Sequence, residues 1–281
     1  MNSTPTVLLD NLTFPECPRW HDGSLWFSDV HAHRIMRVDA QGNARVALAD
    51  AHQPAGLGWA PDGSLLFVRM AERTLMRVAD GVAGTVADLS LLEQVQLNDM
   101  TVDARGRAYI GAFGFDINAG EKAVTANIFL VQPDGAVRVA ADNLRFPNGM
   151  VITPDGRTLI VAETVGRCLT AFDIAADGSL SNRRAWAPLA IFPDGICLDA
   201  EGAVWAAAPV TGVCVRVREG GEVTDTVSVE NKGVYACMLG GEDGRTLYLC
   251  TARTTGPDLA KGVSTGWIET VCVEIAHAGL P

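Results

Sequence analysis

One hairpin pattern recurs six times along the chain, and this repeat constrains the fold more than any other feature. Each copy is an apolar strand, a turn containing glycine, and a second apolar strand. The six copies are PRWHDGSLWFSD, GWAPDGSLLFVR, TVDARGRAYIGA, VITPDGRTLIVA, CLDAEGAVWAAA and LGGEDGRTLYLC. The residues before the turn glycines are Asp22, Asp62, Arg105, Asp155, Glu201 and Asp243, so successive copies lie 40 to 50 residues apart. A repeat of this length indicates an array of similar supersecondary units.

Each unit has room for four strands. Glycine accepts a positive φ, so Asp-Gly or Arg-Gly between alternating apolar segments predicts a hairpin. In the first unit, two further strand-like stretches follow the hairpin, HRIMRVDA and ARVALAD. Six units of four antiparallel strands predict an all-β, six-bladed β-propeller that occupies residues 1–281 as a single domain. A β-sandwich or a β-helix is the alternative, and it would require six phased turns by coincidence.

The two ends of the chain are predicted to meet in one blade. Thr6–Asp10 (TVLLD) precedes the first complete unit, and the last unit ends at Thr270–Ile275 (TVCVEI). We expect Thr6–Asp10 to add an outer strand to the last blade, which closes the ring and removes exposed edges. Helical periodicity is nearly absent, and Leu89–Gln96 is the one plausible helical turn.

Charge and composition narrow the classes of partner. The chain has 22 basic and 33 acidic residues, a net charge of −11, and no Lys/Arg-rich run, which argues against nucleic acid. No apolar run approaches the ~20 residues that span a bilayer, and the first residues lack the pattern of a signal peptide, so we expect no membrane partner. Seven scattered cysteines without a CxxC pair favour a reducing compartment, and we predict a cytoplasmic location. The sequence does not indicate an oligomeric state.

Reading the six units at the same phase identifies a candidate metal site. The residues that precede each turn by six or seven positions are Glu16, Ala55, Asn98, Asn148, Asp194 and Ala236. We expect them on the loops that enter the first strands, which line the central channel, so that they form a ring at one mouth. Crowded carboxylates are unfavourable without a cation, and oxygen ligands suit a hard divalent ion. The prediction is one divalent ion, Ca²⁺ first, with Zn²⁺, Mn²⁺, Mg²⁺ and Fe²⁺ as alternatives, held by Glu16, Asn148 and Asp194.

The phrases around these three residues are nearly identical. They are Phe14-Pro15-Glu16, Phe146-Pro147-Asn148-Gly149 and Phe192-Pro193-Asp194-Gly195. Proline fixes the backbone before the ligand, and glycine after it permits a sharp turn into the strand. The alternative explanation is that these phrases only form the same kind of turn in each repeat. The third residue, however, has a side-chain oxygen in all three phrases.

The chain resembles the SMP-30/gluconolactonase/luciferin-regenerating-enzyme family over essentially its whole length. The resemblance is carried by Pro15-Glu16-Cys17-Pro18-Arg19-Trp20, Leu97-Asn98-Asp99, Phe146-Pro147-Asn148-Gly149-Met150 and Phe192-Pro193-Asp194-Gly195. It implies a six-bladed propeller with a divalent metal on its axis, and usually hydrolysis of lactones. It also implies metal binding at Glu16, Asn148 and Asp194, and contact with substrate or water at Asn98.

Two departures from the family's pattern bear on the substrate. Cys17 stands where glycine often follows the glutamate, either beside the metal or packed in the core. Gln96 stands where sugar lactonases often carry arginine, so a guanidinium that grips hydroxyls or a carboxylate is missing and the substrate need not be a sugar acid. The long third unit adds the stretch Gly114–Ala126, with Phe113, Phe115 and Asp116 as lid or pocket candidates or parts of an exposed linker.

These residues predict a metal-dependent lactonase acting on a small molecule, with metal-activated water as the nucleophile. Asp194 is the expected catalytic base, and Asn98, Gln96, Phe113 and Phe115 are the expected substrate contacts. Glu163 and Arg167 reach the pocket or lie on the surface. No GxSxG or GxGxxG occurs, which argues against a serine nucleophile and a nucleotide cofactor, and His31 and His33 are expected as exposed turn residues. A phosphotriesterase-like or other metal-dependent reaction at the same site and a non-catalytic metal-binding propeller remain as alternatives.

Overall fold

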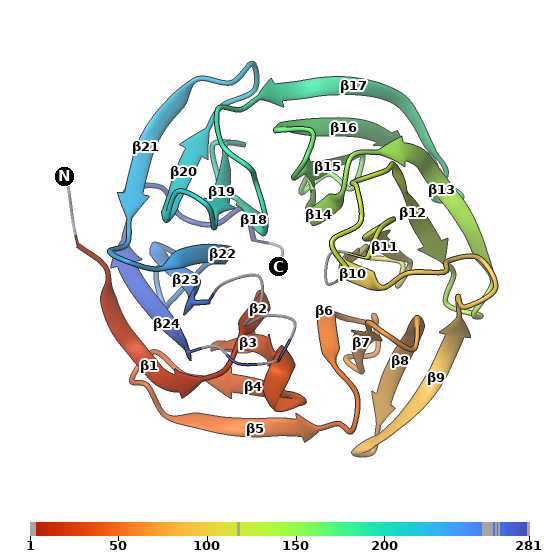
Figure 1. The fold of residues 1–281 in the computed structure, drawn as a ribbon, viewed down its shortest axis with the longest axis horizontal. Coiled ribbons are helices and arrows are strands. Elements are labelled where there is room, and N and C mark those ends of the chain that lie inside the picture. Colours follow the sequence, from red (N-terminus) through yellow and green to blue (C-terminus); the bar gives the residue numbers. More distant parts are fainter. Residues whose placement is uncertain (1–3, 117–118, 255–260, 262, 264, 280–281) are drawn as a thin grey trace.

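Six four-stranded antiparallel sheets surround a central axis, which confirms the six-bladed β-propeller (Figure 1). The computed structural model describes residues 4–116, 119–254, 261, 263 and 265–279. No helix among these residues is long and apolar enough to cross a membrane.

The strands follow the chain blade by blade, and the first strand of each blade is the innermost. Blades 1 to 3 comprise β2 (Pro15–His21), β3 (Ser24–Asp29), β4 (Arg34–Val38), β5 (Ala44–Ala49), β6 (Pro54–Trp59), β7 (Leu65–Arg69), β8 (Thr74–Ala79), β9 (Val82–Asp88), β10 (Leu97–Val102), β11 (Ala108–Ala112), β12 (Ala126–Val131) and β13 (Val137–Leu144). Blades 4 to 6 comprise β14 (Pro147–Ile152), β15 (Thr158–Glu163), β16 (Cys168–Ile174), β17 (Leu180–Pro188), β18 (Ile196–Leu198), β19 (Val204–Ala208), β20 (Val213–Val217), β21 (Val223–Ser228), β22 (Gly233–Gly240), β23 (Thr246–Arg253) and β24 (Thr265–Cys272), with β1 (Thr6–Leu12) from the N-terminal end.

The ring is closed as the sequence predicts. Strand β1 pairs with β24 as the outermost strand of blade 6, with Thr6 opposite Thr270 and Leu12 opposite Gly266. Figure 1 shows β1 on the rim, next to β24 and far from the axis. The pairing covers the edge of β24.

The six repeated hairpins do not share one turn geometry. At the first hairpin both Asp22 and Gly23 have positive φ, as a type I′ turn requires. In the other five, only the glycine adopts a positive φ, for example Gly63 at +81° within a turn in which Gly63 N donates to Ala60 O at 2.8 Å. The glycine is therefore required for its left-handed backbone at all six turns.

Helical structure is confined to short turns in the described part of the chain. The expected helical segment Leu89–Gln96 forms a single turn, in which Glu93 N donates to Leu89 O at 3.0 Å, and does not continue as a helix. A 3₁₀ turn, η1 (Val30–Ala32), which the sequence analysis missed, connects β3 to β4.

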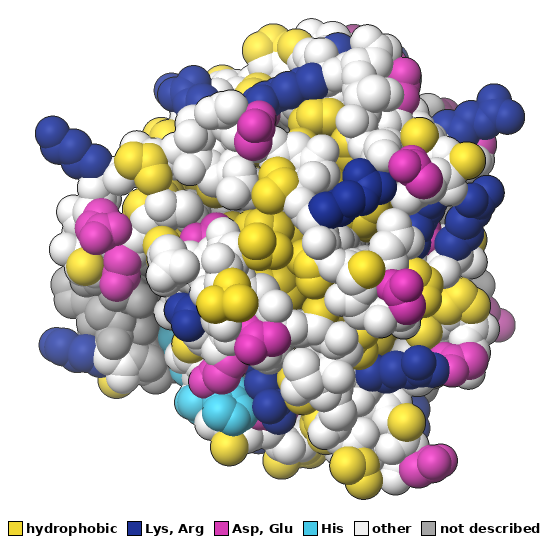
Figure 2. Space-filling model, turned by 90° about the vertical axis from the view of Figure 1, so that its right-hand side faces the viewer, with side chains coloured by type: hydrophobic (Ala, Val, Ile, Leu, Met, Phe, Trp, Pro, Cys, Tyr) yellow, Lys and Arg dark blue, Asp and Glu magenta, His cyan; other side chains and the backbone are white. Residues whose placement is uncertain are grey.

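The core lies between the faces of neighbouring blades. One cluster joins residues of blades 5, 6 and 1, such as Trp205, Tyr248 and Phe27, and others join the remaining neighbours. Packing between blades therefore fixes the inner strands relative to one another. On the side of the molecule that Figure 2 shows, basic and acidic side chains are interspersed and form no patch of one sign.

Glycines allow the inner strands to approach closely around the axis. A Cβ at Gly149 would lie 2.5 Å from Ile196 N, and a Cβ at Gly195 would lie 2.5 Å from the Cβ of Ala236. Neither glycine has a positive φ; Gly149 lies within β14, so no turn follows Asn148, whereas the chain bends at Gly195 directly before β18, as expected after Asp194. Glycine is needed there because the backbone of the next blade occupies the space where a side chain would lie.

Candidate functional site

The six phase-equivalent residues lie at the beginnings of the inner strands. Glu16 is in β2, Asn98 in β10 and Asn148 in β14, so the expectation of loop positions is wrong for them and holds only for Asp194, which precedes β18. The pairing register shifts directly beside the ring positions in blades 1, 2, 3, 4 and 6. Because a β-bulge re-aims a side chain, these irregularities allow strand residues to face the channel mouth.

Hydrogen bonds tie the ring positions of neighbouring blades together. Asn98 Nδ2 donates to Pro147 O at 3.3 Å, and Gly149 N donates to Asp194 O at 3.2 Å. Asn148 Nδ2 donates to Thr164 Oγ1 at 3.2 Å, and this hydroxyl donates to Pro193 O at 2.7 Å. The backbones of blades 3, 4 and 5 therefore hold one another in place beside the ring.

Buried negative charge is concentrated at the ring. Burial and, secondly, the charge of Asp99 raise the pKa of Asp194 from 3.8 to about 8, against a lowering hydrogen bond from Asn148. Burial also raises the pKa of Glu16 well above its usual value, with the charge of Asp194 as the second cause. Two carboxyl groups that disfavour each other's ionisation are suited to sharing a cation.

An ion pair that the sequence analysis missed lies beside these carboxylates. Arg19 Nη2 donates to Asp99 Oδ1 at 2.8 Å and to the carbonyl of Met100, and both side chains of the pair are almost fully buried. The available signal was an arginine in the strand predicted to line the channel, three residues after Glu16. Arg19 is therefore paired with Asp99, and its charge also acts on Glu16.

The donor set at the ring suits a hard divalent ion. It offers carboxylate oxygens from Glu16 and Asp194 and carboxamide oxygens from Asn98 and Asn148, which are the ligand types of Ca²⁺ and Mg²⁺. Within the described ranges, no group of three or more His, Cys, Asp or Glu side chains has an arrangement that could hold a metal ion. Any metal at the ring therefore depends on the carboxamides, as the predicted set of Glu16, Asn148 and Asp194 requires.

The predicted substrate contacts form one wall beside blades 3 and 4. Phe113 N donates to Gln96 O at 3.0 Å, which places Gln96 beside the Phe113 backbone. The rings of Phe113 and Phe115 lie 4.9 and 5.3 Å from that of Phe146. Phe115 is buried against Phe146 and supports the wall, whereas Phe113 and Gln96 are partly exposed. Within the insertion Gly114–Ala126, residues 117–118 lie outside the described residues.

A second aromatic group, which the sequence analysis did not assign to the site, lies between blades 6 and 1. The ring of Phe14 lies 4.7 Å from that of Tyr235 and 5.2 Å from that of His31. Tyr235 directly precedes the ring position Ala236, and burial raises the pKa of its phenol, which the charges of Asp194 and Glu16 raise further. His31 is half-buried with its pKa lowered by burial, so the expectation of an exposed turn residue is wrong for it.

The remaining candidates have local partners. Glu163 is buried, accepts from Arg183 at 2.9 Å and from Thr170 Oγ1 at 2.6 Å, and therefore does not lie on the surface. Arg167 lies over the Phe192 ring at 5.1 Å. Cys17 is buried in an apolar cluster and burial raises the pKa of its thiol.

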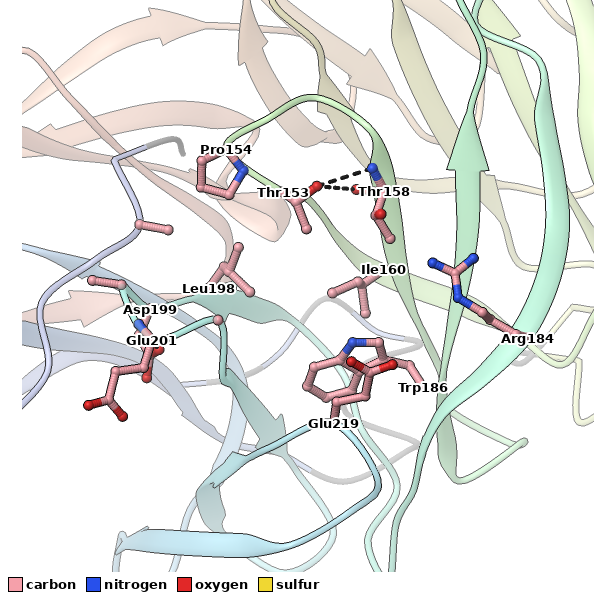
Figure 3. Close-up of a pocket in the computed structure, with 13 residues that line it drawn as sticks. Thr153, Pro154, Thr158, Ile160, Arg184, Trp186, Leu198, Asp199, Glu201 and Glu219 are labelled. Carbon is pink, nitrogen blue, oxygen red and sulfur yellow. Dashed lines mark hydrogen bonds between the residues drawn. The ribbon is translucent and has the colours of Figure 1, made fainter.

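A pocket of about 500 Å³ opens between blades 4 and 5, far from the ring (Figure 3). It is lined by Thr153, which follows β14, by Leu198 at the end of β18, by Glu201 beyond it, and by Trp186. Thr153 is five residues beyond Asn148 along a strand, a distance of about 16 Å. The pocket is a gap between blades at the opposite face, and its Asp199 and Glu201 are already paired with Arg216.

The sequence matches the family described as SMP-30/Gluconolactonase/LRE-like region over residues 14–253. The chain belongs to this family. It is 26% identical over 252 residues to regucalcin of Danio rerio, covering 84% of this chain and 82% of the relative. It is 28% identical over 249 residues to pentonolactonase XacC of Haloferax volcanii, covering 86% and 82%.

Solved structures of relatives have the same fold. A luciferin-regenerating enzyme superposes with a TM-score of 0.82 at 19% identity, covering 97% of both chains. A gluconolactonase from Xanthomonas campestris superposes with a TM-score of 0.74 at 24% identity, covering 94% of this chain and 89% of that one. At these identities the superpositions support the propeller architecture, while the activity has to be argued from the site.

Proposed function

We propose that this protein is a metal-dependent lactonase, a hydrolase that opens a small cyclic ester with water at the mouth of the central channel. The observation that carries the proposal is the pair of carboxyl groups at the ring, the partly buried Glu16 and the buried Asp194, whose pKa values are both raised and which lie beside two carboxamides. Membership of a family with lactonases among its named members supports the reaction class.

The charges at the ring match a divalent cation. When Glu16, Asp99 and Asp194 are all ionised, their three negative charges exceed the single positive charge of Arg19 by two, which a divalent cation would balance. Glu16, Asn148 and Asp194 would hold the ion, and regucalcin among the relatives, together with a calcium-binding regucalcin among the solved structures, supports Ca²⁺. When bound, such an ion would polarise the ester carbonyl and make a nearby water more acidic.

The chain's own residues would then position and deprotonate the reactants. Asp194 would accept the proton of the attacking water, because its side chain is a carboxylate at the ring that could reach both the ion and the water. Asn98 orients the substrate or the water. Asn148 helps to position Asp194, because its side chain donates to Thr164, whose hydroxyl donates to Pro193 O, and because Gly149 N donates to Asp194 O.

The surroundings favour a lactone of low polarity. Gln96 offers a carboxamide where a guanidinium would bind a sugar acid, and Phe113 and Phe146 form an aromatic wall beside it. Near the ends of β3, β7 and β15, the basic side chains Arg34, Arg69 and Arg183 are committed to Asp29, Asp50 and Glu163.

A panel of substrates and metals tests the proposal. We expect hydrolysis of γ- and δ-lactones with Ca²⁺, Mn²⁺ or Zn²⁺, a higher kcat/KM for alkyl- or aryl-substituted lactones than for aldonolactones, and loss of activity on chelation. Asp194→Asn should lower kcat by at least ~10²-fold, whereas Asp243→Asn, in an exposed turn on the opposite face, serves as the control and should leave kcat unchanged.

Three outcomes would contradict the proposal. Hydrolysis that survives exhaustive chelation would remove the role of the metal. Organophosphate turnover with no lactone turnover would indicate a phosphotriesterase-like reaction at the same residues. Metal binding without turnover of any substrate in the panel would indicate a binding propeller.

A further inference from the structure

Tyr235 occupies an unusual place in the innermost strand of blade 6. In the β22–β23 pairing, Val234 is opposite Thr251 and Ala236 is opposite Cys250, so Tyr235 is the extra residue of a bulge. Blade 6 lies between blade 5, which carries Asp194, and blade 1, which carries Glu16 (Figure 1). The bulge therefore places Tyr235 between the strands of the two acidic ring residues.

The backbone and ring of Tyr235 are held on both sides. Its carbonyl accepts a hydrogen bond at 2.8 Å from Gly195 N, the residue after Asp194. Its ring meets that of Phe14 edge-on with centroids 4.7 Å apart, and a Cβ at Gly233 would come within 2.9 Å of the Tyr235 ring. These contacts fix the orientation of the phenol relative to Asp194 and to the strand that begins with Glu16.

The hydroxyl itself is available for a ligand. No hydrogen bond of the Tyr235 hydroxyl is recorded among the described residues, in contrast to Tyr109, whose hydroxyl donates to Gly178 O at 3.0 Å. The phenol is close enough to Asp194 and Glu16 for both carboxylates to act on it electrostatically. The neighbouring ring position, Ala236, is buried against Gly195, whereas the Tyr235 side chain is partly exposed.

We propose that the Tyr235 hydroxyl is a further catalytic residue, which donates a hydrogen bond to the carbonyl oxygen of the bound cyclic ester. The inference rests on the proposed function, since it assigns a role in the same reaction. Glu16 and Asp194 accept hydrogen bonds when ionised, and the carboxamides of Asn98 and Asn148 already donate to Pro147 O and Thr164 Oγ1. The Tyr235 hydroxyl is therefore a neutral donor for the oxygen that gains charge.

The donation requires no net transfer of a proton from tyrosine. As a water oxygen bonds to the carbonyl carbon, the π electrons of the C=O bond move to its oxygen, and the water proton goes to Asp194. The O–H···O bond from Tyr235 strengthens as this oxygen becomes negative. When the carbonyl reforms, the ring C–O bond breaks and the leaving alkoxide takes up the proton that Asp194 holds.

Tyr235→Phe is the decisive variant, because it removes the hydroxyl and keeps the ring on Phe14 and Gly233. We expect kcat for the best lactone to fall by ~10²-fold, with KM and the Ca²⁺ dissociation constant changed less than about threefold. Tyr248→Phe is the matched control. Tyr248 is buried in the neighbouring strand β23, and its side chain stacks on Trp20, away from the six residues at the channel mouth. Thermal unfolding of both variants checks that the fold is intact.

A binding measurement that needs no turnover separates this inference from the proposed function. 2-Piperidinone, a lactam with the same carbonyl geometry as a δ-lactone, is titrated calorimetrically into wild-type protein and both variants in the presence of Ca²⁺. Tyr235→Phe should bind it about fivefold more weakly than the other two. If wild-type protein hydrolyses no lactone, the proposed function fails, while the lactam titration still decides whether Tyr235 donates to a carbonyl.

Three results would overturn the inference. One is a kcat for Tyr235→Phe within twofold of wild type. Another is lactam binding that is equal in Tyr235→Phe and wild type, or absent from wild type. The third is a loss of Ca²⁺ affinity in Tyr235→Phe that accounts for the whole loss of activity, since this would make Tyr235 a support of the metal site.

Discussion

At the scale of single residues, the acidic side chains at the channel mouth lower the stability of the native state when they are ionised. Glu16, Asp99 and Asp194 are buried close enough for their negative charges to affect one another, and Arg19 is the only guanidinium paired with them among the described residues. Buried charges without full compensation destabilise the native state. The metal-free protein therefore contains electrostatic strain that a divalent cation would relieve.

This strain predicts a pH dependence of stability that a metal removes. The pKa of Asp194 is about 8 in the native metal-free protein against 3.8 when unperturbed, so the native state binds more protons between these values. The free energy of unfolding of the metal-free protein should therefore fall as pH rises from about 4 to about 8. Chemical denaturation with a chelator and with Ca²⁺, across that range, measures the effect.

The matched variant for this prediction is Asp194→Asn, which keeps the side chain's shape and removes its titration. Its metal-free stability should depend less steeply on pH than that of wild type. Equal slopes in the two proteins, or a wild-type slope that Ca²⁺ leaves unchanged, would contradict the assignment of the strain to the ring.

The six residues at the channel mouth could be found from the sequence because each precedes the hairpin turn of its repeat by six or seven positions. Glu16, Asn148 and Asp194 also follow the same Phe-Pro dipeptide. Tyr235 was missed because a bulge adds one residue to β22, and a shift of one residue reverses the face to which a side chain points. Arg19 was missed because its partner Asp99 comes from blade 3, and sequence spacing does not show that two inner strands are in contact.

At the scale of strands, glycine determines how closely the inner strands of neighbouring blades approach. Gly149 N donates to Asp194 O at 3.2 Å, and the space beside its Cα is filled by backbone atoms of Asp194, Gly195 and Ile196. The phase of the repeat predicted that a glycine follows the ring residue, but the reason lies in the neighbouring blade and not in the local turn. The distance between Asn148 and Asp194 thus depends on the absence of a side chain.

Gly149→Ala tests this dependence. The added Cβ would lie 2.5 Å from Ile196 N, so β14 and β18 must separate. We expect the protein to be destabilised by ~1–3 kcal/mol. We also expect a ~10²-fold lower kcat/KM, because a displacement of about 1 Å between reacting groups has effects of this size. Denaturant unfolding and lactone hydrolysis measure the two.

Gly84→Ala is the control for this substitution. Gly84 lies in β9, an outer strand, without a positive φ, and a Cβ at this position would have no neighbouring atom within 4 Å, so the added methyl group meets open space. Its stability should change by less than about 0.5 kcal/mol and its activity should match wild type. An equal loss of activity in both variants would show that spacing between β14 and β18 is not what matters.

At the scale of the whole molecule, the fold was predictable because the same local signals occur six times in phase. A single Asp-Gly turn is weak, whereas six turns each followed by strands of similar length leave few architectures. The pairing of β1 with β24 joins the two ends of the described chain, with a register interrupted between Val7 and Leu9 and between Leu9 and Leu12. These interruptions could not be predicted, because they depend on how β1 follows the curve of the rim.

Deleting residues 1–12 should weaken the ring as a whole. The deletion exposes the eight-residue edge of β24 and removes Leu12, which is buried in the cluster that joins blades 5, 6 and 1. We expect a loss of ~2–5 kcal/mol from packing alone, and self-association through the free edge. Leu12→Ala separates the two effects, because it loses packing and keeps the edge covered, so it should be destabilised and remain monodisperse. A truncated protein that matches wild type in unfolding midpoint and in light scattering would show that β1 does not close the ring energetically.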